Sequence, residues 1–186
     1  QNCVVIHLTL VPFLHASGEL KTKPTQHSVK MLLEEGIQPD VLVLRTEHPL
    51  TEDLRRKVAL FCNVEAGAVV ESIDVSTIYE VPLMMQKEML DQTVLRKLGL
   101  PTGSEPSLDE WKEFLHKLKN PAHNVKIALV GKYVELADAY KSITEAFIHA
   151  GAANNAAVEL IMIHSEEITE NNYRERLQGF DGIVVA

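Results

Sequence analysis

The feature that most constrains the fold is an alternation between short runs of apolar, β-branched residues and segments whose apolar residues recur every three or four positions. In the first half of the chain, runs of the first kind lie at 4–10, 41–44 and 68–70. The run at 4–10 is apolar almost throughout, as expected of a strand that is covered on both faces. Strands that alternate with amphipathic helices build parallel sheets. The sequence therefore predicts an α/β fold that opens with a β-α-β unit.

Capping and spacing signals place the helices between these strands. We expect Thr25 to cap the first helix, Val29, Leu32 and Leu33 to form its buried face, and Gly36 to follow its end.

The second helix is expected to begin after a cap at Thr51 and to bury Leu54, Val58 and Phe61, which recur at helical spacing. The Leu and Met residues of 82–98 also indicate helix.

A helix that contains Trp111 is predicted to start from a capping box formed by Ser107 and Glu110. Lys-Asn-Pro at 119–121 ends this helix and marks a boundary, after which a second α/β series begins. Its strands are expected at 125–130, 158–163 and 182–185, and its helices at 140–150 and 171–177. In a doubly wound sheet, ligand-binding loops follow the strands, and this series stops at Ala186, at the end of its third strand. We therefore expect two incomplete parallel-sheet units.

Composition limits the partners and the compartment. The net charge of −8 argues against a nucleic-acid partner, and no apolar run approaches the length of a transmembrane segment, about 20 residues. Cys3 and Cys62 lie in or beside apolar segments, which predicts buried thiols in a reducing, cytoplasmic setting rather than a disulfide scaffold.

The segment Lys21-Thr22-Lys23-Pro24-Thr25-Gln26 has the chemistry of a phosphate site. Two ammonium groups, two hydroxyls and an amide precede or open a predicted helix, whose first N–H groups attract anions. A solvated loop with a simple Thr25 cap explains the same residues, and an exposed helix face explains Lys57 equally well.

Other motifs are absent or incomplete. Gly131-Lys132 lacks the remaining residues of a phosphate-binding P-loop, and neither metal-ligand spacing nor a nucleophile motif is present. Asp138, Tyr140 and Lys141 fit either an active-site loop or a surface cluster at a helix start. No catalytic residue and no metal ligand can be assigned from spacing.

Five segments matter in their order along the chain: 17–29, which contains Lys21-Thr22-Lys23-Pro24-Thr25-Gln26, then 36–40, 57–64, 78–83, and 130–136 with 138–142. Together these collinear segments resemble the CTP synthase family. The resemblance implies ATP-dependent amination of UTP to CTP, with glutamine or ammonia as nitrogen donor, magnesium (Mg²⁺) as metal cofactor and GTP as allosteric activator. It also implies a cytoplasmic homotetramer.

The same resemblance implies a domain arrangement. Residues 1–119 would be the C-terminal portion of a P-loop-type amidoligase (synthase) domain, and 120–124 would be a linker. Residues 125–186 would be the N-terminal portion of a flavodoxin-like class I glutamine amidotransferase domain. The family's P-loop, its Mg²⁺ ligands and its glutaminase nucleophile match no residue here, so the 186-residue chain alone is expected to be inactive.

Carried over residue by residue, the resemblance implies two nucleotide sites. UTP, or the feedback inhibitor CTP, would be bound by Lys21, Thr22, Lys23, Pro24, Thr25, Gln26 and Lys57, at a site completed by neighbouring subunits. ATP would lie near Arg45, Asp74 and Val75. Phe61 lies close to the nucleotide-binding helix position, although packing is its expected role.

Two alternatives stay open. The chain could belong to a non-catalytic nucleotide-binding or assembly module derived from such an enzyme. It could also belong to another amidotransferase-coupled synthetase, such as those that act on cobyric acid, although the Lys21–Gln26 segment argues against this.

Overall fold

Two parallel sheets organise the protein, one in each half of the chain. A computed structural model describes residues 3–136 and 138–186, and the chain divides into two units, Gln1–Pro106 and Ser107–Ala186. This confirms the predicted α/β class. The helix at 109–119 lies in the second unit, whereas the expected domain boundary followed that helix; the boundary of the family's domains stays a prediction.

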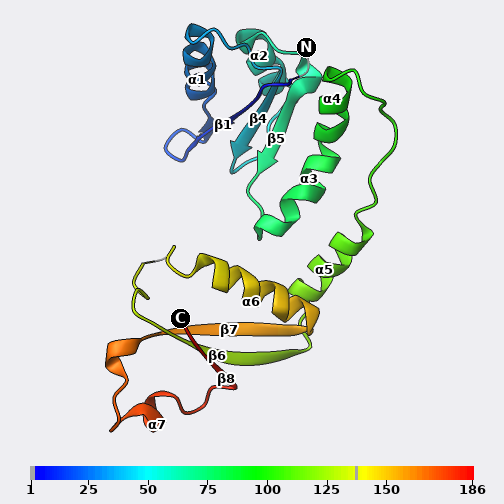
Figure 1. The fold of residues 1–186 in the computed structure, drawn as a ribbon. Coiled ribbons are helices and arrows are strands. Elements are labelled where there is room, and N and C mark those ends of the chain that lie inside the picture. The colour runs from blue at the N-terminus through cyan, green and yellow to red at the C-terminus, as the bar shows by residue number, and fades with distance from the viewer. Residues whose placement is uncertain (1–2, 137) are drawn as a thin grey trace. The chain divides into compact units, whose positions relative to one another are not determined.

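The first unit is built on a three-stranded parallel sheet in the order β1-β4-β5. Figure 1 shows its strands between helices. The elements of this unit are β1 (Ile6–Leu10), β2 (Phe13–Leu14), β3 (Glu19–Leu20), α1 (Lys23–Glu34), β4 (Val41–Thr46), α2 (Glu52–Cys62), β5 (Val69–Ile73), α3 (Val81–Lys87) and α4 (Leu90–Lys97).

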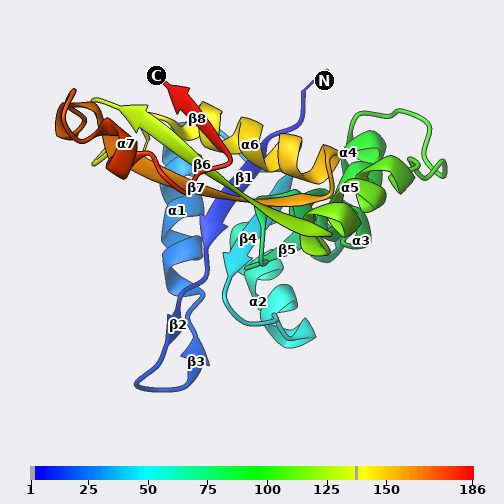
Figure 2. The same cartoon turned by 90° about the horizontal axis from the view of Figure 1, so that it is seen from below.

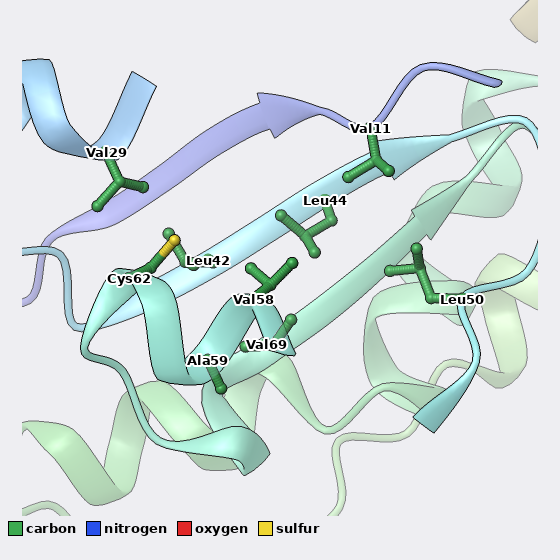
Figure 3. Packing of buried hydrophobic residues seen from close by; sticks show 9 residues of the cluster. All are labelled: Val11, Val29, Leu42, Leu44, Leu50, Val58, Ala59, Cys62 and Val69. Carbon is green, nitrogen blue, oxygen red and sulfur yellow. The ribbon is translucent and has the colours of Figure 1, made fainter. Parts of the chain in front are cut away.

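Alternating side chains of β4 supply both cores of this unit. Leu42 and Leu44 are fully buried against α1 and α2, in the cluster drawn in Figure 3. Val41 and Val43 point to the other face, where Met85 of α3 and Leu90 of α4 pack. A strand with apolar residues on both faces is the pattern of a parallel sheet with helices on each side.

The first two helices differ in part from the expected pattern. The N-cap of α1 is Thr22, so Thr25 lies inside the first turn, and the expected Thr25 cap is wrong. Leu33 is exposed rather than buried. The Thr51 cap of α2 is confirmed, since its side chain accepts a hydrogen bond from the Leu54 N–H. Phe61, expected to pack, is 63% exposed.

Three further expectations about this half and its boundary are corrected. Segment 82–98 is two helices, because Met89 adopts a left-handed conformation with φ 58°. No capping box precedes the helix at 109–119: its N-cap is Leu108, and Ser107 donates a hydrogen bond to Asp109 instead. Cys62 is buried as predicted, but Cys3 is exposed.

The second unit contains a parallel sheet in the order β7-β6-β8. All three strands were expected, and β8 has the predicted bounds. Ala128, Val130 and Ile163 form its core with Ile168, Leu177 and Phe180. The elements are α5 (Asp109–Lys119), β6 (His123–Gly131), α6 (Lys141–Ala153), β7 (Ala156–His164), α7 (Tyr173–Arg176) and β8 (Gly182–Val185).

Candidate functional site

The loop that follows β1 places Lys21 beyond the carboxyl end of the first sheet. Figure 2 shows the β2–β3 hairpin after the arrowhead of β1. Gly18 turns this hairpin with φ 66°, and its N–H donates to the Leu14 carbonyl. The Lys21 N–H then donates to the Pro12 carbonyl over 2.9 Å. The hairpin therefore holds the backbone of Lys21 at the edge of the sheet where α/β proteins bind ligands.

The N-terminus of α1 follows directly, and the Thr22 side chain does not cap it. The Thr22 hydroxyl instead accepts a hydrogen bond from the Gln26 amide over 3.1 Å. Pro24 lies in the first turn, where it has no N–H to lose. The first-turn N–H groups of a helix lack intrahelical partners, so this end has an electropositive surface that suits an anion.

The lysines of the predicted site differ in their surroundings. The Lys21 ammonium lies 2.9 Å from a carboxylate oxygen of Glu19, and both side chains are partly exposed. Lys23 is exposed at the first position of α1. Lys57 is exposed on α2, which packs beside α1 on the same face of the sheet. The structure therefore brings Lys21 and Lys23 to one helix end, whereas Lys57 comes from the neighbouring helix.

Thr25 occupies a different environment from the other residues of this segment. Its side chain is completely buried. The hydroxyl lies 2.9 Å from the Thr9 hydroxyl and donates to the Leu10 carbonyl over 3.2 Å. Both partners belong to β1, so the Thr25 hydroxyl faces the sheet rather than the solvent.

A second hollow lies at the carboxyl ends of β4 and β5 and brings together all three residues predicted for ATP. Arg45, Asp74 and Val75 line this space of about 480 Å³. The Arg45 guanidinium lies 3.4 Å from the Asp74 carboxylate. Ser72 and four apolar residues complete the lining: Leu8, Ile73, Ile78 and Val81. An apolar hollow with one cation and one carboxylate fits a planar heterocycle that carries hydrogen-bonding groups.

Sequence reasoning missed Glu19, the carboxylate that pairs with Lys21. The sequence carried no clear signal for this pair, because β3 ends at Leu20 and the strand period does not extend to Lys21. The expectation that the first strand is covered on both faces is wrong: Ile6, Leu8 and Leu10 of β1 share one face and are 45%, 65% and 54% exposed.

The loop after β6 does not form a phosphate site. The N–H groups of Lys132 and Tyr133 both donate to the Tyr140 hydroxyl, over 3.0 and 3.2 Å. Tyr140 therefore fills this turn, in agreement with the failed P-loop comparison at Gly131-Lys132. Asp138 and Lys141 flank the start of α6, and Lys141 pairs with Glu145 over 2.9 Å.

Within residues 3–136 and 138–186, no group of three or more His, Cys, Asp or Glu side chains is arranged to hold a metal ion. No helix in the same ranges is long and apolar enough to cross a membrane.

Comparison with known proteins identifies the family. A family model described as the N-terminus of CTP synthase matches residues 1–100. The CTP synthase of Flavobacterium psychrophilum is 64% identical over 186 residues, which is all of this chain and 35% of that protein. The CTP synthase of Cytophaga hutchinsonii is 63% identical over 185 residues and is covered over 34% of its length. The chain thus spans about a third of the length of these relatives, and it belongs to the CTP synthase family.

Proposed function

We propose that this chain is the nucleotide-binding middle part of a CTP synthase, a ligase that aminates UTP to CTP at the expense of ATP. The observation that carries the proposal is the segment from Lys21 to Gln26, which lies at the N-terminus of α1 and beyond the carboxyl end of a parallel sheet. Family membership supports this reading over a solvated loop. Glutamine or ammonia would supply the nitrogen in the complete protein.

Each exposed group of this segment has a role suited to its chemistry. Lys21 and Lys23 would neutralise the triphosphate of UTP or CTP, and the first-turn N–H groups of α1 would add directional hydrogen bonds. Gln26, which is half-buried and bonded to Thr22, would contact the phosphate or the sugar with its remaining polar atoms. Lys57 would approach from α2. Pro24 and the Thr25 side chain would shape the helix end rather than touch the ligand.

The hollow at Arg45, Asp74 and Val75 is the proposed place of the ATP base. The guanidinium can stack on a purine ring, and the carboxylate can accept hydrogen bonds from an exocyclic amine. Mg²⁺ would enter with the phosphates of ATP, which supply the oxygen ligands that it prefers. GTP activation and glutamine hydrolysis are assigned no residue of this chain.

The strand order supports the proposed domain arrangement. In the second unit β6, the first strand along the chain, lies between β7, the second, and β8, the third. A flavodoxin-like sheet begins with this 2-1-3 order. This order supports the proposal that 125–186 start the glutamine amidotransferase domain. The family resemblance further suggests 120–124 as the linker, of which 123–124 already belong to β6, and 1–119 as the later portion of the P-loop-type amidoligase domain.

Self-association as a cytoplasmic homotetramer belongs to the same proposal. Four large apolar side chains are exposed on the neighbouring helices α1 and α2: Met31, Leu33, Leu60 and Phe61. Exposed apolar side chains on helices that pack side by side are a feature of protein interfaces. A neighbouring subunit that covers them would also come close to Lys57, which supports a nucleotide site completed between subunits.

The proposal is tested by calorimetry of UTP and CTP binding to the full-length protein that contains this chain. A charge-assisted hydrogen bond is worth about 1.5–3 kcal/mol, so Lys21→Ala and Lys57→Ala should each raise Kd about 10- to 100-fold. Lys30→Ala is the matched control, because Lys30 is exposed on α1 and pairs only loosely with Glu34, at 3.9 Å. If Lys21→Ala and Lys57→Ala bind like the control variant, the site assignment is wrong.

A further inference from the structure

Helices usually pack on parallel sheets through apolar contacts. Between β1 and α1, polar side chains make part of the contact instead. His7 and Thr9 lie two residues apart on β1 and face the helix, as the period of a strand requires. Thr25 and Ser28 lie three residues apart on α1 and so share a helix face. The His7 ring nitrogen lies 2.8 Å from the Ser28 hydroxyl, and the two threonine hydroxyls lie 2.9 Å apart.

The distances around the threonine pair favour one order of donors. The Thr25 hydroxyl carries one hydrogen, which it donates to the Leu10 carbonyl over 3.2 Å. With Thr25 donating to Leu10, the Thr9 hydroxyl is the donor of the 2.9 Å bond to Thr25, and this order uses the shorter of the two contacts to the Leu10 carbonyl, 3.2 Å against 3.5 Å from Thr9. A directed chain therefore runs from Thr9 to Thr25 and on to the last carbonyl of β1.

We propose that Thr9 is a positioning residue for the nucleotide site, and that it acts through Thr25 on the N-terminus of α1. The inference rests on the proposed UTP/CTP site. Thr25 is two residues from Lys23 and one from Gln26, so the position of its hydroxyl sets where these two side chains and the first-turn N–H groups lie. The residue that determines the geometry of the site thus belongs to β1, 12 residues before Lys21 in the sequence.

Hydrogen bonds are needed here because apolar contacts alone do not fix a helix along its axis. Val29 is the one fully buried apolar side chain that α1 contributes to the core within the described residues. A single apolar contact lets α1 slide along its axis. The two hydrogen-bonded bridges, Thr9–Thr25 and His7–Ser28, are one helical turn apart and fix both the translation and the rotation of α1 on the sheet. Phosphate recognition is sensitive to displacements of about 0.5 Å, so loss of a bridge should affect UTP more than a ligand bound elsewhere.

The test uses the full-length protein, with calorimetric Kd values for UTP and for a non-hydrolysable ATP analogue. Thr9→Val should raise the Kd for UTP about fivefold, the equivalent of one ordinary hydrogen bond, and should leave the Kd for the ATP analogue within twofold. Thr9→Ser keeps the hydroxyl and should restore UTP binding. Thr144→Val is the matched control, because it removes a similar half-buried hydroxyl, which bonds the Tyr140 carbonyl in the second unit.

Ser28→Ala tests the second bridge, to His7. Alanine is the better helix former, which offsets part of the stability lost with the bridge, and the Kd for UTP should rise twofold to fivefold. An equal loss of affinity for UTP and for the ATP analogue would overturn the inference in favour of general destabilisation. Unchanged UTP binding in Thr9→Val and Ser28→Ala, with weakened binding in Lys21→Ala, would overturn the positioning role alone. If Lys21→Ala also binds normally, the proposed site itself fails.

Discussion

The half-buried ion pair between Arg55 and Glu88 is expected to hold the two helix layers of the first unit on their sheet. The guanidinium of Arg55, on α2, donates to both carboxylate oxygens of Glu88 over 2.6 and 3.1 Å, and also to the Val69 carbonyl of β5. A carboxylate oxygen of Glu71 lies 3.5 Å from the Arg55 guanidinium, and the backbone N–H of Glu71 donates to the Glu88 carboxylate. Glu88 follows α3, so one cluster ties α2, β5 and α3 together.

The burial of this pair determines how much Glu88→Gln should cost. Breaking a buried pair costs about 3–5 kcal/mol, and an exposed pair contributes less than about 1 kcal/mol. The Arg55 and Glu88 side chains are 20% and 18% exposed, and Glu71 remains as a second carboxylate. We therefore expect Glu88→Gln to lower the free energy of local opening by about 2 kcal/mol. This corresponds to about a 30-fold increase in the local opening constant.

Hydrogen–deuterium exchange of the full-length protein measures this loss where it occurs. Peptides from α2, β5 and α3 should exchange about 30-fold faster in Glu88→Gln. Glu65→Gln is the control, because Glu65 pairs with Arg96 and Lys97 but is 53% exposed, and it should change exchange less than threefold. Equal effects of the two substitutions would refute the argument from burial.

The same pair has a predictable pH dependence. Burial by itself would raise the pKa of Glu88, but the hydrogen bonds from Arg55 and from the Glu71 N–H together lower it below the usual value. A lowered folded-state pKa means that the stabilisation is complete above the unfolded-state pKa of about 4.3 and is lost as the pH falls through the folded-state value. The hydrogen bond to Glu88 raises the pKa of Arg55 against the effect of burial, so Arg55 stays charged throughout. The difference between the parent protein and Glu88→Gln should therefore be constant from pH 8 to about 5.5 and shrink below about pH 4.

Three further outcomes are expected. Glu19→Gln frees the Lys21 ammonium from a competing carboxylate, so calorimetry should show about threefold tighter UTP binding at low salt and a smaller gain at high salt; weaker binding would contradict this. Gly131→Ala should lower the melting temperature, because a Cβ there would overlap the Tyr140 ring; an unchanged melting temperature would show that the ring moves freely. Burial raises the pKa of the Cys62 thiol, so mass spectrometry should find it unmodified by iodoacetamide at pH 8 until the protein is denatured, and rapid labelling of the folded protein would contradict its burial.

Periodicity was sufficient for the sheets but not for the ends and faces of the helices. The strand at 41–44 was recognisable because a buried strand is apolar on both faces, and β4 has that property. The Thr25 cap was misassigned because Thr22 and Thr25 both precede apolar helical residues. Only the position of β1 shows which of the two hydroxyls turns toward the sheet. Phe61 was misassigned because helical spacing identifies a shared face but not whether a neighbour covers it.

The candidate site divides in the same way. The charges of Lys21 and Lys23 and their place at a helix start were legible from the sequence. That Arg45 and Asp74 face each other in one hollow with Val75 was not, because they are 29 residues apart and meet only when β4 and β5 pair in register. Spacing could not indicate the role proposed for Thr9, since a threonine in an apolar run looks the same whether or not its hydroxyl has a partner.

The sequence by itself determined the class of fold and the family, because strand and helix periods and collinear motifs are local properties of the chain. Tertiary structure alone decided which polar groups turn toward a neighbouring element and which bond within their own. Thr25 has a hydroxyl like that of Thr22, yet its side chain is directed at β1, whereas the Thr22 hydroxyl bonds Gln26 within the same turn. The physical reason is that a hydrogen bond depends on the distance and direction between two groups, and for groups on different elements these are set only when the elements pack.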